Sequence, residues 1–302
     1  MSVERLAVYT TIYPAVKPYL ADWYRSVQQQ TDKKFDLYIG VDSLSCEEIA
    51  VAMGDVPQAT LLSNLAGASS AQIRNAALER LVDEYDAIVL VDSDDLLLPS
   101  RVYAARSALQ TYDVTGCALR LIDEHGRDLG FTFGPACTAD YGSLLARYNV
   151  FGLSNTAYRA ATLRRCLPVP EDCVLIDWLL ATRAWANGAK LDFDPVARMS
   201  YRQYGNNTAR VLPPFTAQYI KRAAQLVVDH YRLLFATDKL EGLAGNSMML
   251  ATAFRRANRF HHAITTERDK LHQYVKALNK LTPKYVWWWC IAHPQLEEIW
   301  NN

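Results

Sequence analysis

Short apolar runs separated by amphipathic stretches fill residues 1–110 of the chain. Uniformly apolar runs of this length are typical of strands that are buried on both faces of a sheet. Such runs lie at Leu6–Thr11, Phe35–Val41 and Ala87–Val91. A weaker run lies at Thr60–Leu62. We expect these segments to form the strands of one sheet.

The stretches between these runs carry apolar side chains at helical spacing. One predicted helix has an apolar face that consists of Leu20, Trp23, Tyr24 and Val27. A second is predicted from Ser69 or Ser70, either of which can cap it, to about Asp83, and a third at Ser100–Ala108. Because strands alternate with helices, we expect right-handed βαβ units and a mostly parallel sheet, which is an α/β fold.

The pattern changes after residue 112. The elements predicted next are two strands joined by a turn, a helix that ends at Gly188, and two short strands. They span Val114–Ile122, Leu129–Phe133, Val174–Asn187, Lys190–Phe193 and Val196–Tyr201. After Pro213 and Pro214 the periodicity is helical. We therefore expect an α/β domain at residues 1–212, with halves 1–112 and 113–212, and a helical extension at 213–302.

Charge and cysteine content narrow the function classes. Lysine plus arginine and aspartate plus glutamate each number 32, so the formal net charge is zero. A neutral chain lacks the basic field that general nucleic-acid binding requires. No stretch approaches the ~18 uninterrupted apolar residues of a membrane-spanning helix. The cysteines form no C-x-x-C pair, a pattern typical of reduced thiols in a cytoplasmic protein.

One apolar strand ends in three carboxylates within four residues, at Asp92, Asp94 and Asp95. Ligands of open α/β sheets bind beyond the carboxyl ends of the strands. Positions i and i+2 of extended backbone project to the same side, so Asp92 and Asp94 can face one site. Carboxylates this close repel one another unless a cation is bound, and their oxygens suit Mg²⁺ or Mn²⁺ shared with substrate phosphates. The alternative is an Asp-rich turn that caps the next helix.

Asp-x-Asp at a strand end is also the nucleophile loop of haloacid-dehalogenase-like phosphatases. In that family the motif normally lies on the first strand and is followed by Gly or Thr-Thr. Here three predicted strands precede it, and Asp95-Leu96 follows. A phosphatase is therefore the less favoured interpretation.

Four further motifs accompany the acidic cluster in a definite order. They are Asp42 at the end of the second predicted strand, Arg74-Asn75, Asp177-Trp178, and Tyr201-Arg-Gln-Tyr-Gly-Asn-Asn207. Together with the acidic cluster they resemble the inverting family 2 glycosyltransferases of GT-A fold. The last segment is similar to the Tyr-Arg-Gln-His-Gly-Asn-Asn stretch of bacterial surface-polysaccharide members. The resemblance covers residues 5–210.

This resemblance implies a GT-A domain at residues 1–212, Rossmann-like and mostly parallel, with a nucleotide-sugar half (1–112) and an acceptor half (113–212). It implies metal-dependent, inverting transfer of a hexosyl or deoxyhexosyl group from a nucleotide-diphosphate sugar to a hydroxyl. The acceptor would be a glycan or lipid-linked glycan in polysaccharide or glycolipid synthesis. A non-catalytic module of the same fold, which binds sugar nucleotides or glycans, is the competing function.

The resemblance also assigns roles to residues. The residues that would line the nucleotide pocket are Thr10, Thr11, Tyr13, Asp42, Arg74, Asp92 and Ser93. The residues that would hold Mn²⁺ or Mg²⁺ are Asp94, Asp92 and Asp95. A bound cation of this kind stabilises the charge that develops on the departing nucleotide.

Asp177 matches the family's catalytic base. A sugar hydroxyl is a poor nucleophile near neutral pH, so a carboxylate that takes its proton during attack accelerates transfer by typically ~10²–10⁴-fold. Attack opposite the departing diphosphate inverts the anomeric centre. A purely structural role, at the start of a helix whose dipole favours an acid, is the alternative, and Glu171-Asp172 is a rival pair.

Tyr204 stands where many members of the family have histidine. A neutral phenol is a weak ligand for Mg²⁺ or Mn²⁺, so Tyr204 is expected to contact a sugar or phosphate rather than the metal. Arg202 and Arg210 flank the Gly-Asn-Asn turn, and we expect this loop to close over the diphosphate.

The C-terminal region carries Trp287-Trp288-Trp289 among basic residues. Such a composition is found in membrane-interface anchors, and peripheral contact with the inner face of a membrane is one interpretation. The other, which we favour, is that residues 213–302 pack on the rest of the protein or form a homodimer interface, with the tryptophans in a core.

Overall fold

The computed structural model describes residues 2–63, 67–136, 140–205, 207–237, 244–283 and 286–301. The chain forms two compact units. The first comprises Met1–Cys137 and Phe151–Tyr204, and the second comprises Thr138–Val150 and Gly205–Asn302. The division at Tyr204/Gly205 lies close to the boundary expected near residue 212. The inclusion of residues 138–150 in the second unit was not predicted.

The first unit is built on one nine-stranded sheet with the order β3-β2-β1-β4-β8-β6-β9-β5, in which β7 pairs with β6. Its strands are β1 (Leu6–Ile12), β2 (Asp36–Val41), β3 (Thr60–Ser63), β4 (Ala87–Leu90), β5 (Leu96–Leu97), β6 (Val114–Ile122), β7 (Asp128–Phe133), β8 (Thr156–Arg159) and β9 (Leu191–Arg202). The sheet thus contains all the strands that the hydrophobic pattern predicts.

Strands β3, β2, β1 and β4 form a wholly parallel half-sheet. Every residue of β1 and β4 is buried, as expected for strands covered on both faces. Because parallel strands share one carboxyl edge, the residues that follow β1, β2 and β4 lie at the same edge.

The other half of the sheet is mixed. β8 lies antiparallel between β4 and β6, whereas β9 runs parallel to β6. The two short strands expected at Lys190–Phe193 and Val196–Tyr201 are one strand, β9, with register shifts against Cys117 and Ala118. The register shifts take up the irregular residues in the middle of β9, so the strand stays paired with β6 along its length and does not break in two.

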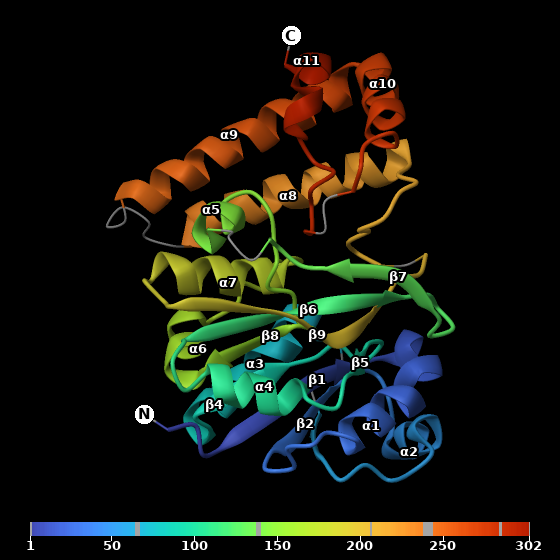
Figure 1. Ribbon diagram of the computed structural model, residues 1–302, viewed down its shortest axis with the longest axis vertical. Coiled ribbons are helices and arrows are strands. Elements are labelled where there is room, and N and C mark those ends of the chain that lie inside the picture. Colours follow the sequence, from blue (N-terminus) through green and yellow to red (C-terminus); the bar gives the residue numbers. More distant parts are fainter. Residues whose placement is uncertain are drawn as a thin grey trace. The chain divides into compact units, whose positions relative to one another are not determined.

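The helices described in the first unit flank the sheet or pack on one another (Figure 1). They are η1 (Pro14–Tyr19), α1 (Leu20–Gln28), α2 (Cys46–Met53), α3 (Ser70–Glu84), α4 (Arg101–Ala108), α6 (Ala160–Cys166) and α7 (Ile176–Ala186). The β1–α1–β2 and β3–α3–β4 connections step in opposite directions along the sheet, so right-handed crossovers place α1 and α3 on opposite faces. α3 packs on α6, and α6 packs on α7.

The second unit is helical, as predicted. It contains α5 (Tyr141–Leu145), α8 (Ala217–Thr237), α9 (Ala244–Thr266), α10 (Arg268–Leu278), η3 (Pro294–Leu296) and α11 (Glu297–Trp300). The apolar seam of α8 is buried, and it consists of Ile220, Ala224, Val227, Tyr231 and Leu234. α9 packs against both α8 and α10.

Residues 140–150 join this unit through specific bonds. The Tyr231 hydroxyl donates to Ala146 O at 2.7 Å. Asn149 and Trp287 exchange backbone hydrogen bonds of 3.3 and 2.9 Å. These contacts link positions far apart in the sequence, which local periodicity cannot reveal.

The three consecutive tryptophans are buried. Trp289 is 0% exposed and donates through Nε1 to Val211 O at 2.9 Å. Trp287 and Trp288 are also buried, so all three lie in a core, as favoured from the sequence, and none is displayed as a surface anchor. Within the described ranges, the helices all fall short of the length and apolarity needed to span a bilayer.

Candidate functional site

The acidic cluster follows β4 at the carboxyl edge of the parallel half-sheet. Val91 N donates to Tyr9 O and Asp42 N donates to Ile12 O, so the chain past β4 and past β2 stays bonded to β1. Asp42, Asp92 and the loop after β1 thus meet at the edge where the topology predicts a ligand.

Asp95 is the structural member of the cluster. It is 0% exposed, its Oδ1 accepts from Arg202 N at 2.7 Å, and its Oδ2 accepts from Ser154 Oγ. Burial raises its pKa well above the ordinary value, and the charges of Asp94 and Asp92 add to this effect. Both carboxylate oxygens are occupied by protein donors, so Asp95 fixes the loop from within.

Arg202 is buried as well. Its Nε donates to Asp94 O at 2.7 Å, and its Nη1 donates to Glu124 O at 3.0 Å. Its guanidinium lies 4.5 Å from the centre of the Tyr19 ring. In this structure the Arg202 side chain holds the acidic loop in shape, and the closure of its loop over a diphosphate stays a prediction.

Asp92 and Asp94 are half-buried and carry the shifted charges of the site. Asp92 Oδ2 accepts from Ser154 Oγ at 3.2 Å, and Asp94 Oδ2 accepts from Tyr204 OH at 2.6 Å. Burial, followed by the charge of Asp94, raises the pKa of Asp92 to about 7. Burial also raises the pKa of Asp94. This pair is poorly solvated as two anions, and a cation beside it would restore the charged form.

Arg74 is the cation nearest to Asp92. Its Nη2 lies 3.9 Å from Asp92 Oδ1. It projects from the second turn of α3, whose start is fixed by a capping box between Ser69 and Gln72. A contact of 3.9 Å is loose, so Arg74 can turn toward an anionic ligand without losing a strong bond.

Two tyrosines, Tyr13 and Tyr204, lie beside the carboxylates of this site. Tyr13 follows β1, and its side chain is hydrogen-bonded to Tyr204. Burial, followed by the charges of Asp94 and Asp92, raises the pKa of Tyr13 to about 12. Burial and Asp94 likewise raise the pKa of Tyr204. Both phenols stay protonated near neutral pH and serve as hydrogen-bond donors.

Asp177 lies in the first turn of α7, as the sequence predicts, and is half-buried. Its charge contributes to the raised pKa of Asp92, so the two carboxylates are within electrostatic reach of each other. The rival pair Glu171 and Asp172 is exposed. The helix dipole favours a carboxylate in the first turn of a helix, so Asp177 also stabilises α7 at the position predicted for the catalytic base.

The remaining candidates divide by exposure. Thr10, Thr11 and Ser93 are buried, and Ser93 Oγ donates to Thr11 O at 2.8 Å. These side chains lie inside the edge, and their predicted place at the nucleotide pocket stays a prediction. Asp42 is half-buried and accepts from Ser43 Oγ at 2.8 Å, which leaves it at the surface of the edge.

Arg210 belongs to the second unit. Its Nη2 lies 3.5 Å from Gly205 O, and its backbone N–H donates to Tyr219 OH at 2.8 Å. Asn206, part of the same predicted loop, lies outside the described residues. The role of Arg210 stays a prediction.

The donor set fits a divalent cation only in part. Among the described side chains, no three His, Cys, Asp or Glu residues are placed to hold a metal ion by themselves. Asp92 and Asp94 present two carboxylates, whose oxygens are hard donors, beside Arg74. A cation that relies on two carboxylates and completes its shell with phosphate oxygens matches this arrangement.

Ser154 and Tyr19 are site residues that the sequence did not reveal. Ser154 contacts two of the three carboxylates from a position 62 residues after Asp92. Tyr19 stacks on Arg202 and lies 5.5 Å from the Tyr204 ring, centre to centre. Neither residue stands in a motif: Ser154 is brought in by the pairing of β8 with β4, and Tyr19 contacts the site through Arg202 at the end of β9.

No protein-family model matches the chain, and no curated protein sequence does. Solved structures do share its fold. S. aureus TarS 1–349 in complex with UDP matches with a TM-score of 0.60 at 16% identity, over 91% of this chain and 79% of that one. The same protein in complex with UDP-GlcNAc matches with 0.54 at 16% identity, over 91% and 88%.

The mannosyltransferase PcManGT from Pyrobaculum calidifontis, in complex with GDP-Man and Mn²⁺, matches with a TM-score of 0.54 at 16% identity. The match covers 92% of this chain and 79% of that one. At this level of identity the comparison concerns the fold. The chain therefore has the α/β fold of GT-A type that the sequence predicts, with a central sheet flanked by helices.

Proposed function

We propose that the protein is a glycosyltransferase that uses a nucleotide-diphosphate sugar and a divalent cation. The observation that carries this proposal is the pair Asp92 and Asp94 at the carboxyl edge of the parallel half-sheet, with Asp177 within electrostatic reach. The fold supports the proposal, because structures that share it contain UDP, UDP-GlcNAc, or GDP-Man with Mn²⁺.

The donor would bind across the ends of β1, β2 and β4. Asp42 would accept a hydrogen bond from the base, and Arg74 would donate to the diphosphate. Tyr13, held protonated, would donate to phosphate or sugar oxygens, and Tyr204, whose hydroxyl donates to Asp94, would stack on the sugar. Asp92 and Asp94 would hold Mn²⁺ or Mg²⁺, which when bound neutralises the charge on the departing nucleoside diphosphate.

Asp177 would act as the general base. Its carboxylate would take the proton of the acceptor hydroxyl as the oxygen attacks the anomeric carbon. The bond to the diphosphate oxygen breaks on the opposite face, so the configuration at that carbon inverts. The transition state has oxocarbenium character, like that of glycoside hydrolysis.

The acceptor would be a hydroxyl of a glycan or of a lipid-linked glycan, at the cytoplasmic side of a membrane. The transferred group would be hexosyl or deoxyhexosyl. A non-catalytic binding module is the second candidate, and it requires the same donor pocket without a working Asp177.

Asp177→Asn separates the two functions. We expect this variant to lose ~10²–10⁴-fold in turnover with a nucleotide sugar and Mn²⁺ while it still binds the nucleotide. Asp172→Asn is the matched control, because it makes the same chemical change at an exposed position nearby. Equal turnover of the two variants would contradict the assignment of Asp177, and absence of turnover in the wild type for every donor and acceptor tried would favour the binding module.

A further inference from the structure

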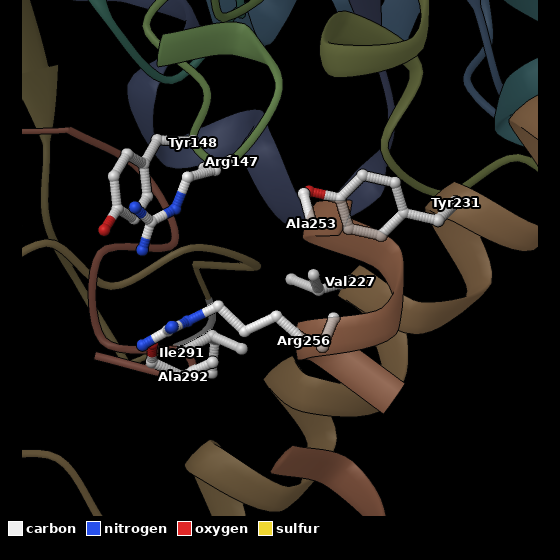
Figure 2. Close-up of a pocket in the computed structure, with 9 residues that line it drawn as sticks. Arg147, Tyr148, Val227, Tyr231, Ala253, Arg256, Ile291 and Ala292 are labelled. Atoms are coloured by element: carbon white, nitrogen blue, oxygen red, sulfur yellow. The ribbon is translucent and has the colours of Figure 1, made fainter. Parts of the chain in front are cut away.

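Two arginines and a buried phenol line a pocket within the helical unit (Figure 2). Arg147 and Tyr148 come from the segment after α5, Arg256 from α9, and Ile291 with Ala292 from the stretch before η3. The empty space between these residues, open solvent at its mouth included, is about 300 Å³. This pocket belongs to the second unit alone and is separate from the acidic cluster.

The backbone that presents Arg147 and Tyr148 is fixed on three sides. Both residues donate their N–H groups to Leu144 O, at 2.9 and 2.7 Å. Tyr231, which also lines the pocket, bonds to Ala146 O, and Asn149 pairs with Trp287. The two side chains therefore leave a rigid frame, which lowers the cost of ordering them around a ligand.

The pocket carries excess positive charge. Arg256 donates from Nε to Ala292 O at 3.1 Å and from Nη1 to Glu297 Oε2 at 2.7 Å. Arg147 has its guanidinium 5.3 Å from the centre of the Tyr148 ring, and no acidic partner for it occurs in the described parts of the chain. Two guanidiniums face one carboxylate, so the site has a net charge of about +1.

Polar atoms in this pocket are buried without partners. Tyr148 is 8% exposed, and its hydroxyl has no hydrogen-bond partner within the described ranges. The same holds for Nη2 of Arg256. Buried polar groups in native proteins are nearly always bonded, so this hydroxyl and guanidinium N–H are available to a hydrogen-bond acceptor that enters the pocket. Figure 2 shows the hydroxyl on the same side of the pocket as both guanidinium groups.

The rest of the lining is apolar, with Val227, Ala253, Ala257 and Ile291 beside the polar end. A ligand that fits must present an acidic group to the arginines and an apolar flank to these side chains. A single negative charge matches the net charge of the site, whereas a dianion would be under-neutralised.

We propose that this pocket binds a monoanionic acid group, a carboxylate or a phosphodiester, on a ligand with an apolar flank. Arg147 and Nη2 of Arg256 donate to its oxygens, and the Tyr148 hydroxyl donates a third bond. The site is additional to the proposed donor site and does not depend on it.

Calorimetric titration and thermal unfolding of the full chain with benzoate, dimethyl phosphate and acetate test the site, with sodium chloride at equal ionic strength as reference. We expect saturable binding and a raised Tm with benzoate or dimethyl phosphate, and the stronger of the two identifies the acid as carboxylate or phosphodiester. Acetate should bind more weakly than benzoate, because it lacks the apolar body. Absence of saturable binding with both benzoate and dimethyl phosphate would overturn the proposal.

Two variants localise the binding. Arg147→Gln should lower affinity about 10-fold, the loss of one charge-assisted hydrogen bond. Tyr148→Phe should also lower affinity, yet leave Tm equal or higher, because it removes a buried hydroxyl without a partner. Arg255→Gln is the matched control, since it removes an exposed charge from the same helix as Arg256. If Arg147→Gln binds benzoate and dimethyl phosphate as well as Arg255→Gln does, the anions act non-specifically and the proposal fails.

Discussion

At the scale of single residues, the acidic loop is shaped by neutral donors as much as by charges. Ser154 Oγ lies 3.2 Å from Asp92 Oδ2, contacts Asp95 Oδ2, and accepts from Asp92 N at 3.2 Å. Hydrogen bonds to a carboxylate favour its charged form. Ser154 therefore keeps two crowded carboxyl groups closer to ionisation than burial alone would allow.

Ser154→Ala removes these bonds and leaves the buried Asp95 with one donor fewer. We expect the free energy of unfolding to fall by about 1–3 kcal/mol, since a buried polar group loses its partner. We also expect weaker binding of Mn²⁺ with UDP or GDP at pH 7, because the carboxyl groups would hold their protons more tightly. Urea unfolding and calorimetry measure the two effects. Ser107→Ala, at an exposed position of α4, is the control and should change neither.

At the scale of elements, α3 connects helix stability to the site. Its capping box between Ser69 and Gln72 sets the first turn, and Arg74 follows in the next. Ser69 Oγ also donates to Glu171 O at 3.2 Å, which ties α3 to the loop before α7 and Asp177. One cap thus positions both the cation and the carboxylate proposed for the reaction.

Ser69→Ala should cost about 1 kcal/mol in unfolding free energy, the usual value of an N-cap. It should also weaken nucleotide binding, because the turn that presents Arg74 becomes less ordered. Ser45→Ala removes the equivalent cap of α2. It should cost a similar amount of stability and leave nucleotide affinity unchanged. A loss of nucleotide affinity in both variants, or in neither, would contradict the claim that the α3 cap positions Arg74 for nucleotide binding.

α8 makes the helical unit sensitive to acid. His230 is buried in this helix beside the Tyr231 ring, and desolvation lowers its pKa to about 3. Below about pH 6.5 the His230 imidazole binds a proton in the unfolded chain but not in the folded chain. The free energy of unfolding therefore falls as the pH decreases toward 3.

His230→Leu should remove this dependence. Relative to the variant, the wild type should lose about 1.4 kcal/mol of stability per pH unit within this window. Urea unfolding at a series of pH values gives the two curves. His125→Leu, at an exposed turn, should follow the wild type. Parallel curves for the wild type and His230→Leu would show that the buried imidazole titrates normally.

At the scale of the whole molecule, the sequence pattern predicted the elements that are determined by residues close together in the chain. β1, β4 and α3 were predicted closely, because each is a continuous apolar run or a capped amphipathic stretch. β8 and the attachment of residues 140–150 to the helical unit were missed. Both depend on partners far along the chain, such as the pairing of Asn149 with Trp287.

The candidate site was likewise predicted where neighbouring residues reveal it and missed where it depends on distant partners. Asp92 and Asp94 were predicted as a pair that faces one site at a strand end, because three carboxylates after a buried strand stand out in the sequence. The roles of Asp95 and Arg202 were not foreseen, since both are determined by contacts made across more than a hundred positions, at 107 for the bond between them. Charge patterns thus indicate where a site lies, while burial decides which members can reach a ligand.

The central claim is that Asp92 and Asp94 hold a divalent cation against a nucleoside diphosphate. Crystals grown with Mn²⁺ and UDP or GDP, measured for the anomalous signal of manganese, test it most directly. The account predicts one strong anomalous peak at coordination distance from both carboxylates, with the diphosphate on its far side next to Arg74. A bound nucleotide with no manganese at these carboxylates, or manganese bound elsewhere with the pair still turned to Ser154 and Tyr204, would contradict it.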